Sequence, residues 1–138
     1  KMSIVDLCAN KYEEDELLDS VTLTVMFCWG NTANGELGLG GIEEERILSP
    51  RELKFANPIR TIACGKSHTL VVTSAGEVYS CGSNDYGELG HNKARTKLHL
   101  VNGLSAYKVK YVACGENHSM ALNEWGQVFT WGSDKYGQ

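Results

Sequence analysis

The sequence has no long hydrophobic run, and only two of its 138 residues are proline. The apolar stretch at its start is soon interrupted by the acidic residues 13–16, so it is too short for a signal peptide or a membrane span. With 42% hydrophobic and 22% charged residues, the composition excludes a disordered or collagen-like chain. We therefore expect a soluble protein of about one domain, with no membrane span.

The sequence also lacks the paired cysteine spacing of a secreted, disulfide-bonded protein. Its cysteines are odd in number and none lies close to another: Cys8, Cys28, Cys64, Cys81 and Cys114. A reducing compartment suits such a set. We expect a cytoplasmic location in the cytosol, with the nucleus as the second compartment.

Basic charge is not in excess either. The formal net charge is −4, and residues 1–25 account for all of it with two lysines and six acidic residues. The other 113 residues hold 11 basic and 11 acidic side chains, so we do not expect a broad face for nucleic acid. We treat residues 1–25 as an acidic N-terminal extension outside the pattern described next.

Glycine is abundant, and much of it belongs to an internal repeat. The block WGNTANGELG at 29–38 returns 52 residues later as CGSNDYGELG at 81–90, and after a further 50 residues as WGSDKYGQ at 131–138. A second block, IACGKSHTLVV at 62–72, returns 50 residues later as VACGENHSMAL at 112–122. Two blocks that recur in the same order with nearly one period define a repeat.

Each repeat predicts β-strands. Apolar and polar residues alternate over 69–73 and a turn follows before 78–81, so 69–81 is expected to form a hairpin and 119–131 its copy. The recurring glycines fit positions that need a positive φ or a close backbone approach. The structural repeat positions are Trp29, Gly30, Gly35, Gly38, Cys64, Gly65, His68, Gly76, Cys81, Gly82, Gly87, Gly90, Cys114, Gly115, His118, Gly126, Trp131, Gly132 and Gly137.

A unit of about 50 residues with several short strands is typical of a four-stranded propeller blade. The two blocks resemble the repeat of the regulator of chromosome condensation family, whose members form seven-bladed propellers. The residues MFCWGN at 26–31 and GELGLGGIEE at 35–44 are most similar to the N-terminus of small HERC proteins. Kelch repeats have a similar period, but the glycine doublet at 40–41 has no counterpart at 92–93.

We therefore predict an all-β fold, an incomplete β-propeller with about two four-stranded blades and the start of a third. Repeat 1 would occupy about 26–79, repeat 2 about 80–129, and the start of repeat 3 would occupy 130–138. Seven blades need roughly 350 residues, so we expect a fragment of a propeller. Its uncovered blade face and strand edges predict weak independent stability and a tendency to associate.

Two Cys-x-x-x-His pairs, Cys64 with His68 and Cys114 with His118, offer the ligand types of a tetrahedral zinc site. Both pairs occupy the same repeat slot, so they would lie in different blades and not converge. We expect no metal and no cofactor. Each cysteine is then a small apolar residue, and each histidine bonds backbone groups of a neighbouring turn.

Other candidate motifs also favour structural roles. Gly65-Lys66-Ser67 resembles the end of a phosphate-binding loop, but Arg60 stands where that motif needs its first glycine. Cys81 shares the slot of two tryptophans, which indicates packing and not a nucleophile. The aromatic residues Trp29, Trp131, Tyr79 and Phe129 are expected in the core, and we favour packing over partner contact for Tyr86 and Tyr136.

The basic segment 93–97, with Lys108 and Lys110, is expected to be a solvated loop. Because loops on a rigid β scaffold often carry function, we expect partner contact at 40–50 and 91–104.

The resemblance implies a protein-interaction module, the N-terminal propeller of a HECT-type E3 ubiquitin-protein ligase. Its partners would be ubiquitination substrates or regulators, and ubiquitin transfer would occur in a HECT domain outside this segment, which itself has no catalytic residue. The alternative is guanine-nucleotide exchange on a small GTPase such as Ran, as the founding family member performs. A chromatin- or membrane-associated scaffold is not favoured by the balanced charge.

Overall fold

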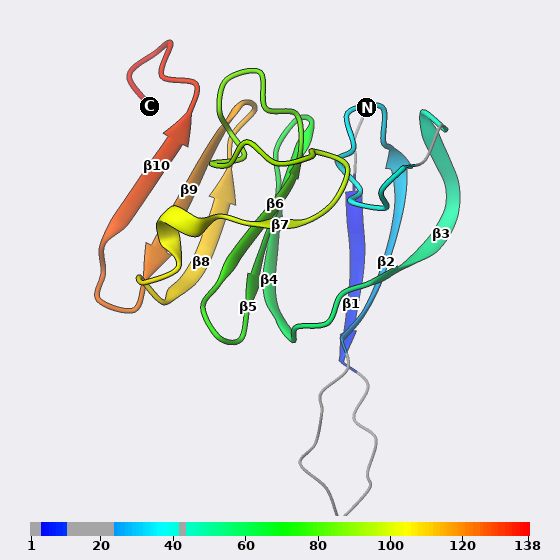
Figure 1. Ribbon diagram of the computed structural model, residues 1–138, viewed down its shortest axis with the longest axis horizontal. Coiled ribbons are helices and arrows are strands. Elements are labelled where there is room, and N and C mark those ends of the chain that lie inside the picture. The colour runs from blue at the N-terminus through cyan, green and yellow to red at the C-terminus, as the bar shows by residue number, and fades with distance from the viewer. Residues whose placement is uncertain (1–3, 11–23, 42–43) are drawn as a thin grey trace, which may run out of the picture.

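The computed structural model of the chain describes residues 4–10, 24–41 and 44–138. In this part the strands form three antiparallel sheets that stand side by side (Figure 1). The strands are β1 (Ile4–Asn10), β2 (Thr24–Asn31), β3 (Arg46–Lys54), β4 (Ile59–Cys64), β5 (His68–Thr73), β6 (Val78–Gly82), β7 (His99–Leu100), β8 (Val109–Cys114), β9 (His118–Asn123) and β10 (Val128–Gly132). One short 3-10 helix, η1 (Asn102–Leu104), follows β7.

The first sheet has the order β1-β2-β3, the second β4-β5-β6-β7 and the third β10-β9-β8. The prediction of an all-β incomplete propeller is confirmed, with one four-stranded sheet between two three-stranded sheets in the described residues. Residues 4–10 pair with β2, with Ile4 opposite Trp29 and Ala9 opposite Val25. The first sheet thus includes part of the segment that we placed outside the repeat.

The two expected hairpins are present and have matching registers. In the first, β5 pairs with β6 so that Val72 lies opposite Val78 and His68 opposite Gly82. In the second, the same slots of β9 and β10 are paired from Leu122 with Val128 to His118 with Gly132. The sequence repeat is therefore a repeat of strand pairing as well as of residue type.

The sheets do not start and end where the predicted repeats do. The boundary between the repeats at 79 and 80 falls inside β6, and the second sheet runs from β4 to β7, across that boundary. The starting residue of a sequence repeat is arbitrary, whereas the bounds of a sheet are set by which strands form hydrogen bonds with one another. The long connection 83–98 leaves β6 at its end and returns as β7 (Figure 1). On the way it bonds the third sheet at Glu88 and the loop after β2 at Thr96.

The core lies between the sheets. All six residues of β5 are buried because both faces of the second sheet are covered. Leu70, Val72 and Val78 pack with Val109 and Ala121 of the third sheet. A second cluster joins Met26, Ile59 and Val71 between the first and second sheets. Burying one such side chain contributes about 1.5–3 kcal/mol, so these two clusters between the sheets contribute much of the fold's stability.

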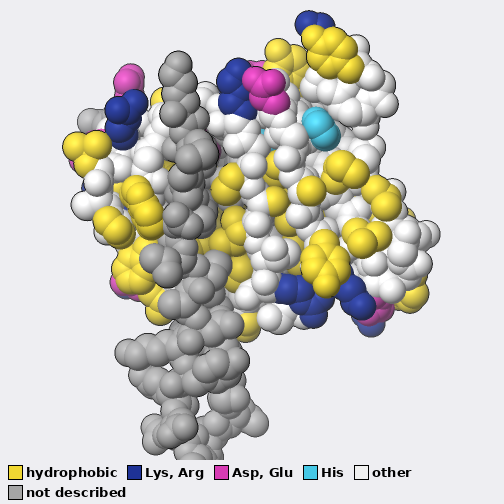
Figure 2. Space-filling model, turned by 180° about the vertical axis from the view of Figure 1, so that it is seen from behind, with side chains coloured by type: hydrophobic (Ala, Val, Ile, Leu, Met, Phe, Trp, Pro, Cys, Tyr) yellow, Lys and Arg dark blue, Asp and Glu magenta, His cyan; other side chains and the backbone are white. Residues whose placement is uncertain are grey.

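The outer face of the third sheet is open. Met120, Leu122 and Val128 stand in the repeat slots of Leu70, Val72 and Val78, yet Val128 is 59% exposed, whereas its counterpart is fully buried. A shallow apolar hollow of about 240 Å³ follows this face. Seen from behind, hydrophobic side chains gather over the end of the molecule formed by β8 to β10 (Figure 2). The face therefore has the composition of a sheet interface.

Glycine is required where one repeat approaches the next. Gly35 has φ +81°, and a Cβ there would lie 2.7 Å from Cα of Thr96. Its counterpart Gly87 has φ +79° but open space around it. The left-handed turn is thus common to both copies, while the close approach of the backbones is specific to the first.

Candidate protein-interaction surface

Each Gly-Glu-Leu-Gly loop is bonded to the sheet that follows it. In the first copy, the carbonyl oxygen of Glu36 accepts a hydrogen bond of 2.7 Å from Oγ1 of Thr69. The thiol of Cys81 donates to the same oxygen over 3.5 Å. The loop of the first repeat is thus held on strands β5 and β6 of the second sheet.

The second copy makes the same contacts with different side chains. The carbonyl oxygen of Glu88 accepts 2.7 Å from Oγ of Ser119 and 2.8 Å from the indole Nε1 of Trp131. Cys81 and Trp131 occupy one repeat slot, and each donates to the glutamate carbonyl of the preceding loop. Cys81 is buried, and in these two copies the slot also supplies a hydrogen-bond donor, which the sequence pattern did not indicate.

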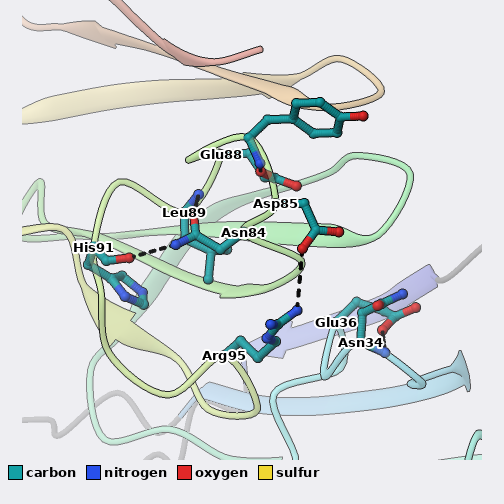
Figure 3. Close-up of polar contacts among 9 residues, drawn as sticks. Asn34, Glu36, Asn84, Asp85, Glu88, Leu89, His91 and Arg95 are labelled. Atoms are coloured by element: carbon teal, nitrogen blue, oxygen red, sulfur yellow. Dashed lines mark hydrogen bonds and ion pairs between the residues drawn. The ribbon is translucent and has the colours of Figure 1, made fainter.

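The glutamate side chains of these loops are fully buried. Oε2 of Glu36 accepts 2.8 Å from the backbone N–H of Asn34, and Oε2 of Glu88 accepts 2.8 Å from that of Tyr86. Each carboxylate therefore closes its own turn (Figure 3). The Oε1 atoms of both have no hydrogen-bond partner within the described ranges. Burial raises the pKa of Glu36, and hydrogen bonds from the backbone of Glu36 and Asn34 oppose that shift.

The second loop has further bonds that fix its shape. Asn84 donates from its amide to the carbonyl oxygen of His91 over 3.0 Å and accepts from the N–H of Leu89 over 3.1 Å. Asp85 lies 3.8 Å from the guanidinium of Arg95 on the returning limb (Figure 3). The loop surface is thus rigidly presented from a β scaffold.

His68 links the second sheet to the third. Its Nε2 lies 3.0 Å from Oγ of Ser119, and that hydroxyl donates to Glu88. Because the hydroxyl proton is used there, Nε2 of His68 carries the proton and donates. Burial lowers the pKa of His68, and the charge of Glu88 opposes this effect. The ring thus bonds the backbone of His118, a partner of the kind that we expected, and also the side chain of Ser119, which we did not expect.

The two Cys/His pairs do not form a metal site. In the part of the chain that the structure describes, no group of three or more His, Cys, Asp or Glu residues is placed to hold an ion. Burial raises the pKa of Cys28 to about 11 and that of Cys114 to about 12, and it also raises that of Cys81. Thiols held in the neutral form are poor nucleophiles, which fits packing roles.

The segment Gly65-Lys66-Ser67 is a short connection between the antiparallel strands β4 and β5, and no helix follows it. The ammonium of Lys66 lies 2.7 Å from a carboxylate oxygen of Glu116, in the equivalent turn of the next sheet. The lysine thus joins two turns on the surface. It does not have the setting of a phosphate-binding lysine.

Two tyrosines at one repeat position are exposed. Tyr86 is 57% exposed and Tyr136 is 82% exposed, so the prediction that they pack was wrong. In both loops the residue two positions later, Glu88 or Gln138, accepts a hydrogen bond from the backbone N–H of the tyrosine. Lys135 lies 5.3 Å from the ring centre of Tyr136.

The expected core aromatics are half-buried, and each packs against a buried cluster: Trp29, Tyr79, Phe129 and Trp131. The basic residues of 93–97 are exposed, as expected. The segment 91–104, which we expected to contact partners, also contains Val101 and Leu104, and both are buried in the core. Its exposed residues are those of 92–97 together with Asn102 and Gly103. The other expected contact segment, 40–50, includes residues 42–43, which lie outside the described residues.

No helix in the described ranges is long and apolar enough to cross a membrane.

The comparisons with known proteins agree with this geometry. Human "Probable E3 ubiquitin-protein ligase HERC4" is 50% identical over 86 residues, which is 61% of this chain and 8% of that protein. The bovine "Secretion-regulating guanine nucleotide exchange factor" is 40% identical over 65 residues, 47% of this chain and 14% of that protein. The chain therefore spans only a small part of either relative.

Among solved structures, yeast RCC1 (Prp20) bound to Kap60 has a TM-score of 0.72 and 28% identity, and the match covers 84% of this chain and 30% of that one. A further structure of Prp20p, described with its binding to Gsp1p and histones, matches equally well with a TM-score of 0.72 and 27% identity, and covers 79% of this chain and 29% of that one.

Two family models describe the repeat itself. One regulator of chromosome condensation (RCC1) model matches residues 25–72 and 75–122, and a second matches 59–88 and 109–138. These ranges contain the buried glutamates, the paired hairpins and the interlocking slots described above. The chain belongs to the regulator of chromosome condensation (RCC1) repeat family.

Proposed function

We propose that this chain is a protein-interaction module from the N-terminal propeller of a HECT-type E3 ubiquitin-protein ligase, and that it recruits substrates or regulators. The proposal rests on the contrast between the buried polar residues of the repeat and its exposed loop residues. The recurring polar residues Glu36, Glu88 and His68 are buried. The glutamate side chains close their own turns, and the glutamate carbonyls and the His68 ring bond the next sheet. The residues left at the surface are loop side chains suited to contact another protein.

The similarity to human HERC4 supports the ligase parent, since half of the 86 aligned residues are identical. In this proposal the chain binds, and a catalytic domain elsewhere in the parent protein transfers ubiquitin. We also propose a cytosolic location with access to the nucleus, which imaging of a fluorescent fusion of the parent protein would test.

The partner-binding surface in this proposal is the loop edge that presents Tyr86 and Tyr136. Aromatic rings supply large contact areas at low entropic cost, and they are enriched at interfaces. The two rings stand in equivalent loops, and polar groups border Tyr86: Asp85 of the Asp85–Arg95 pair precedes it, and Lys66 of the Lys66–Glu116 pair interacts with it electrostatically. Such a surface suits a protein partner better than a small ligand.

The test uses the parent protein with ubiquitin-activating and ubiquitin-conjugating enzymes. We expect self-ubiquitination that is unchanged by Tyr86→Ser and Tyr136→Ser, because those residues take no part in the chemistry. Ubiquitination of a recruited substrate should fall when both tyrosines are changed. Absence of any ubiquitin transfer by the parent protein would contradict the ligase assignment.

A second candidate is guanine-nucleotide exchange on a small GTPase. The similarities to the bovine exchange factor and to yeast RCC1 favour it. Faster release of a fluorescent guanine nucleotide from Ran in the presence of the parent protein would support this candidate. Release at the intrinsic rate, together with ubiquitin transfer, would favour the ligase.

A further inference from the structure

A groove separate from the tyrosine loops opens at the outer rim, between the first and second sheets. It has a volume of about 350 Å³ and is lined by the end of β3 and by the segment that leads into β7. Leu39, Leu53, Phe55 and Leu98 supply its apolar walls. Leu53 and Leu98 also pack on the buried cluster around Met26, so these walls are anchored to the core.

The groove has basic side chains that are not neutralised. Lys54 and Lys97 both line it, and neither forms an ion pair within the described residues. By contrast, nearby Arg51 and Arg95 are paired, with Glu44 and Asp85 respectively. The carbon chain of Lys97 lies against Gly40, where a Cβ would overlap it. This contact holds the lysine stem beside the groove and leaves its ammonium for an anion.

One wall of the groove is also a free sheet edge. β3 is the last strand of the first sheet and is nine residues long, whereas β7, the last strand of the second sheet, has two. Pro50 removes a backbone donor from the first half of β3, which is a common protection of an exposed edge. The second half, 51–54, has no proline, and its last three residues line the groove.

We propose that this groove binds an extended acidic peptide segment of a partner protein, which adds as a strand to β3 along 51–54. Alternate side chains of an added strand point to opposite faces. An apolar side chain opposite Leu53 would enter the groove, since Leu53 faces the space between the sheets. Carboxylates on the flanking positions share the face of Lys54 and would pair with it, while Lys97 on the opposite wall would attract the net negative charge of the peptide.

Strand addition draws its affinity from main-chain hydrogen bonds and its specificity from side-chain pockets, and both are available here. Charge complementarity selects the acidic peptide. Glu52 is the one acidic residue among the groove-lining residues, against two lysines. The proposal gives the chemistry of a partner for the proposed interaction role, but its test requires neither ubiquitin transfer nor nucleotide exchange.

The experiment measures fluorescence anisotropy of a fluorescein-labelled heptapeptide that alternates glutamate and valine, with leucine at its centre. We expect saturable binding by the full chain, at least fivefold weaker binding by Lys54→Glu and by Lys97→Glu, and no measurable binding by the double variant. Lys110→Glu is the matched control, because Lys110 is an exposed lysine on β8, away from the groove. It should bind as the native chain does.

Two further peptides separate strand addition from general charge attraction. A peptide with lysine in place of glutamate should not bind. A peptide with N-methylated backbone at alternate residues should bind at least tenfold more weakly, because it cannot donate to the edge of β3. Three results would each overturn the proposal. They are equal binding of the N-methylated peptide, equal weakening of binding by Lys110→Glu, and no binding of the acidic peptide by a chain that circular dichroism shows to be folded.

Discussion

The bond between His68 and Ser119 allows the joining of neighbouring sheets to be measured. His68→Ala removes a buried hydrogen bond, worth about 1 kcal/mol, and leaves a cavity whose cost is about 1–3 kcal/mol. The free energy of unfolding should therefore fall by about 2–4 kcal/mol. Ser119→Ala should cost about 1–2 kcal/mol, because the donor to Glu88 is lost as well.

The double variant isolates the bond itself. If the imidazole and the hydroxyl interact, the losses of the two single variants should not add, and the coupling energy should be about 1 kcal/mol. Urea unfolding, followed by circular dichroism, measures all four proteins. His118→Ala is the matched control, since His118 stands in the same slot but its ring forms no hydrogen bond to Ser119. It should show a smaller loss.

Acid adds an independent check. Burial lowers the pKa of His68 in the folded state, so its neutral form contributes stability that is complete above its ordinary value of 6.5 and is lost as the pH falls through the lower folded-state pKa. The native chain should therefore lose stability below pH 6.5 more steeply than His68→Ala. A coupling energy near zero, together with identical pH profiles for the two proteins, would show that His68 does not join the two sheets through Ser119.

Three further predictions follow from the same contacts. Gly65→Ala should destabilise the chain by more than about 2 kcal/mol in thermal unfolding, because a Cβ would overlap the ring of His68, while Gly103→Ala, with open space around it, should change stability by less than about 0.5 kcal/mol; equal effects would contradict the steric argument. Burial raises the folded-state pKa of Glu36 above its ordinary 4.5, so the stability linked to its neutral form is complete below pH 4.5 and declines as the pH rises through the higher value. Glu36→Gln should remove that decline in a series of urea unfolding experiments from pH 4 to 7. Parallel profiles for the two proteins would be evidence against it. The open face of the third sheet should make the chain self-associate in analytical ultracentrifugation, and Leu122→Glu with Val128→Lys should reduce the association; a dilute native chain that is monomeric and unfolds in one sharp transition would count against this expectation.

The strands were predictable from the sequence because their signals are local. Alternation over 69–73 and the turn at Gly76 are enough to specify the β5–β6 hairpin, and the copy 50 residues later repeats both. Register within each hairpin follows, since one turn fixes the pairing of both strands. The repeat period then gave the propeller architecture.

The contacts between sheets were not predictable in the same way. Glu36 and Glu88 lie in polar, glycine-rich loops, where a charged residue is normally solvated, and their burial depends on a sheet that arrives from later in the chain. Tyr86 is exposed although Glu88 two residues later is buried, and the local sequence pattern does not separate the two. The groove at the rim joins residues 52–55 and 97–98, so no local pattern marks it.

Each Gly-Glu-Leu-Gly loop is bonded to the following sheet, and hydrogen exchange at the tryptophan indoles measures that bond. Trp131 donates its indole N–H to Glu88 over 2.8 Å, whereas Trp125 is 59% exposed. In a nitrogen-15 spectrum, with Trp29→Phe and Trp125→Phe used for assignment, the Trp131 indole proton should exchange much more slowly than that of Trp125. Equal exchange rates for the two indoles would show that the Trp131–Glu88 bond does not hold the loop on the sheet.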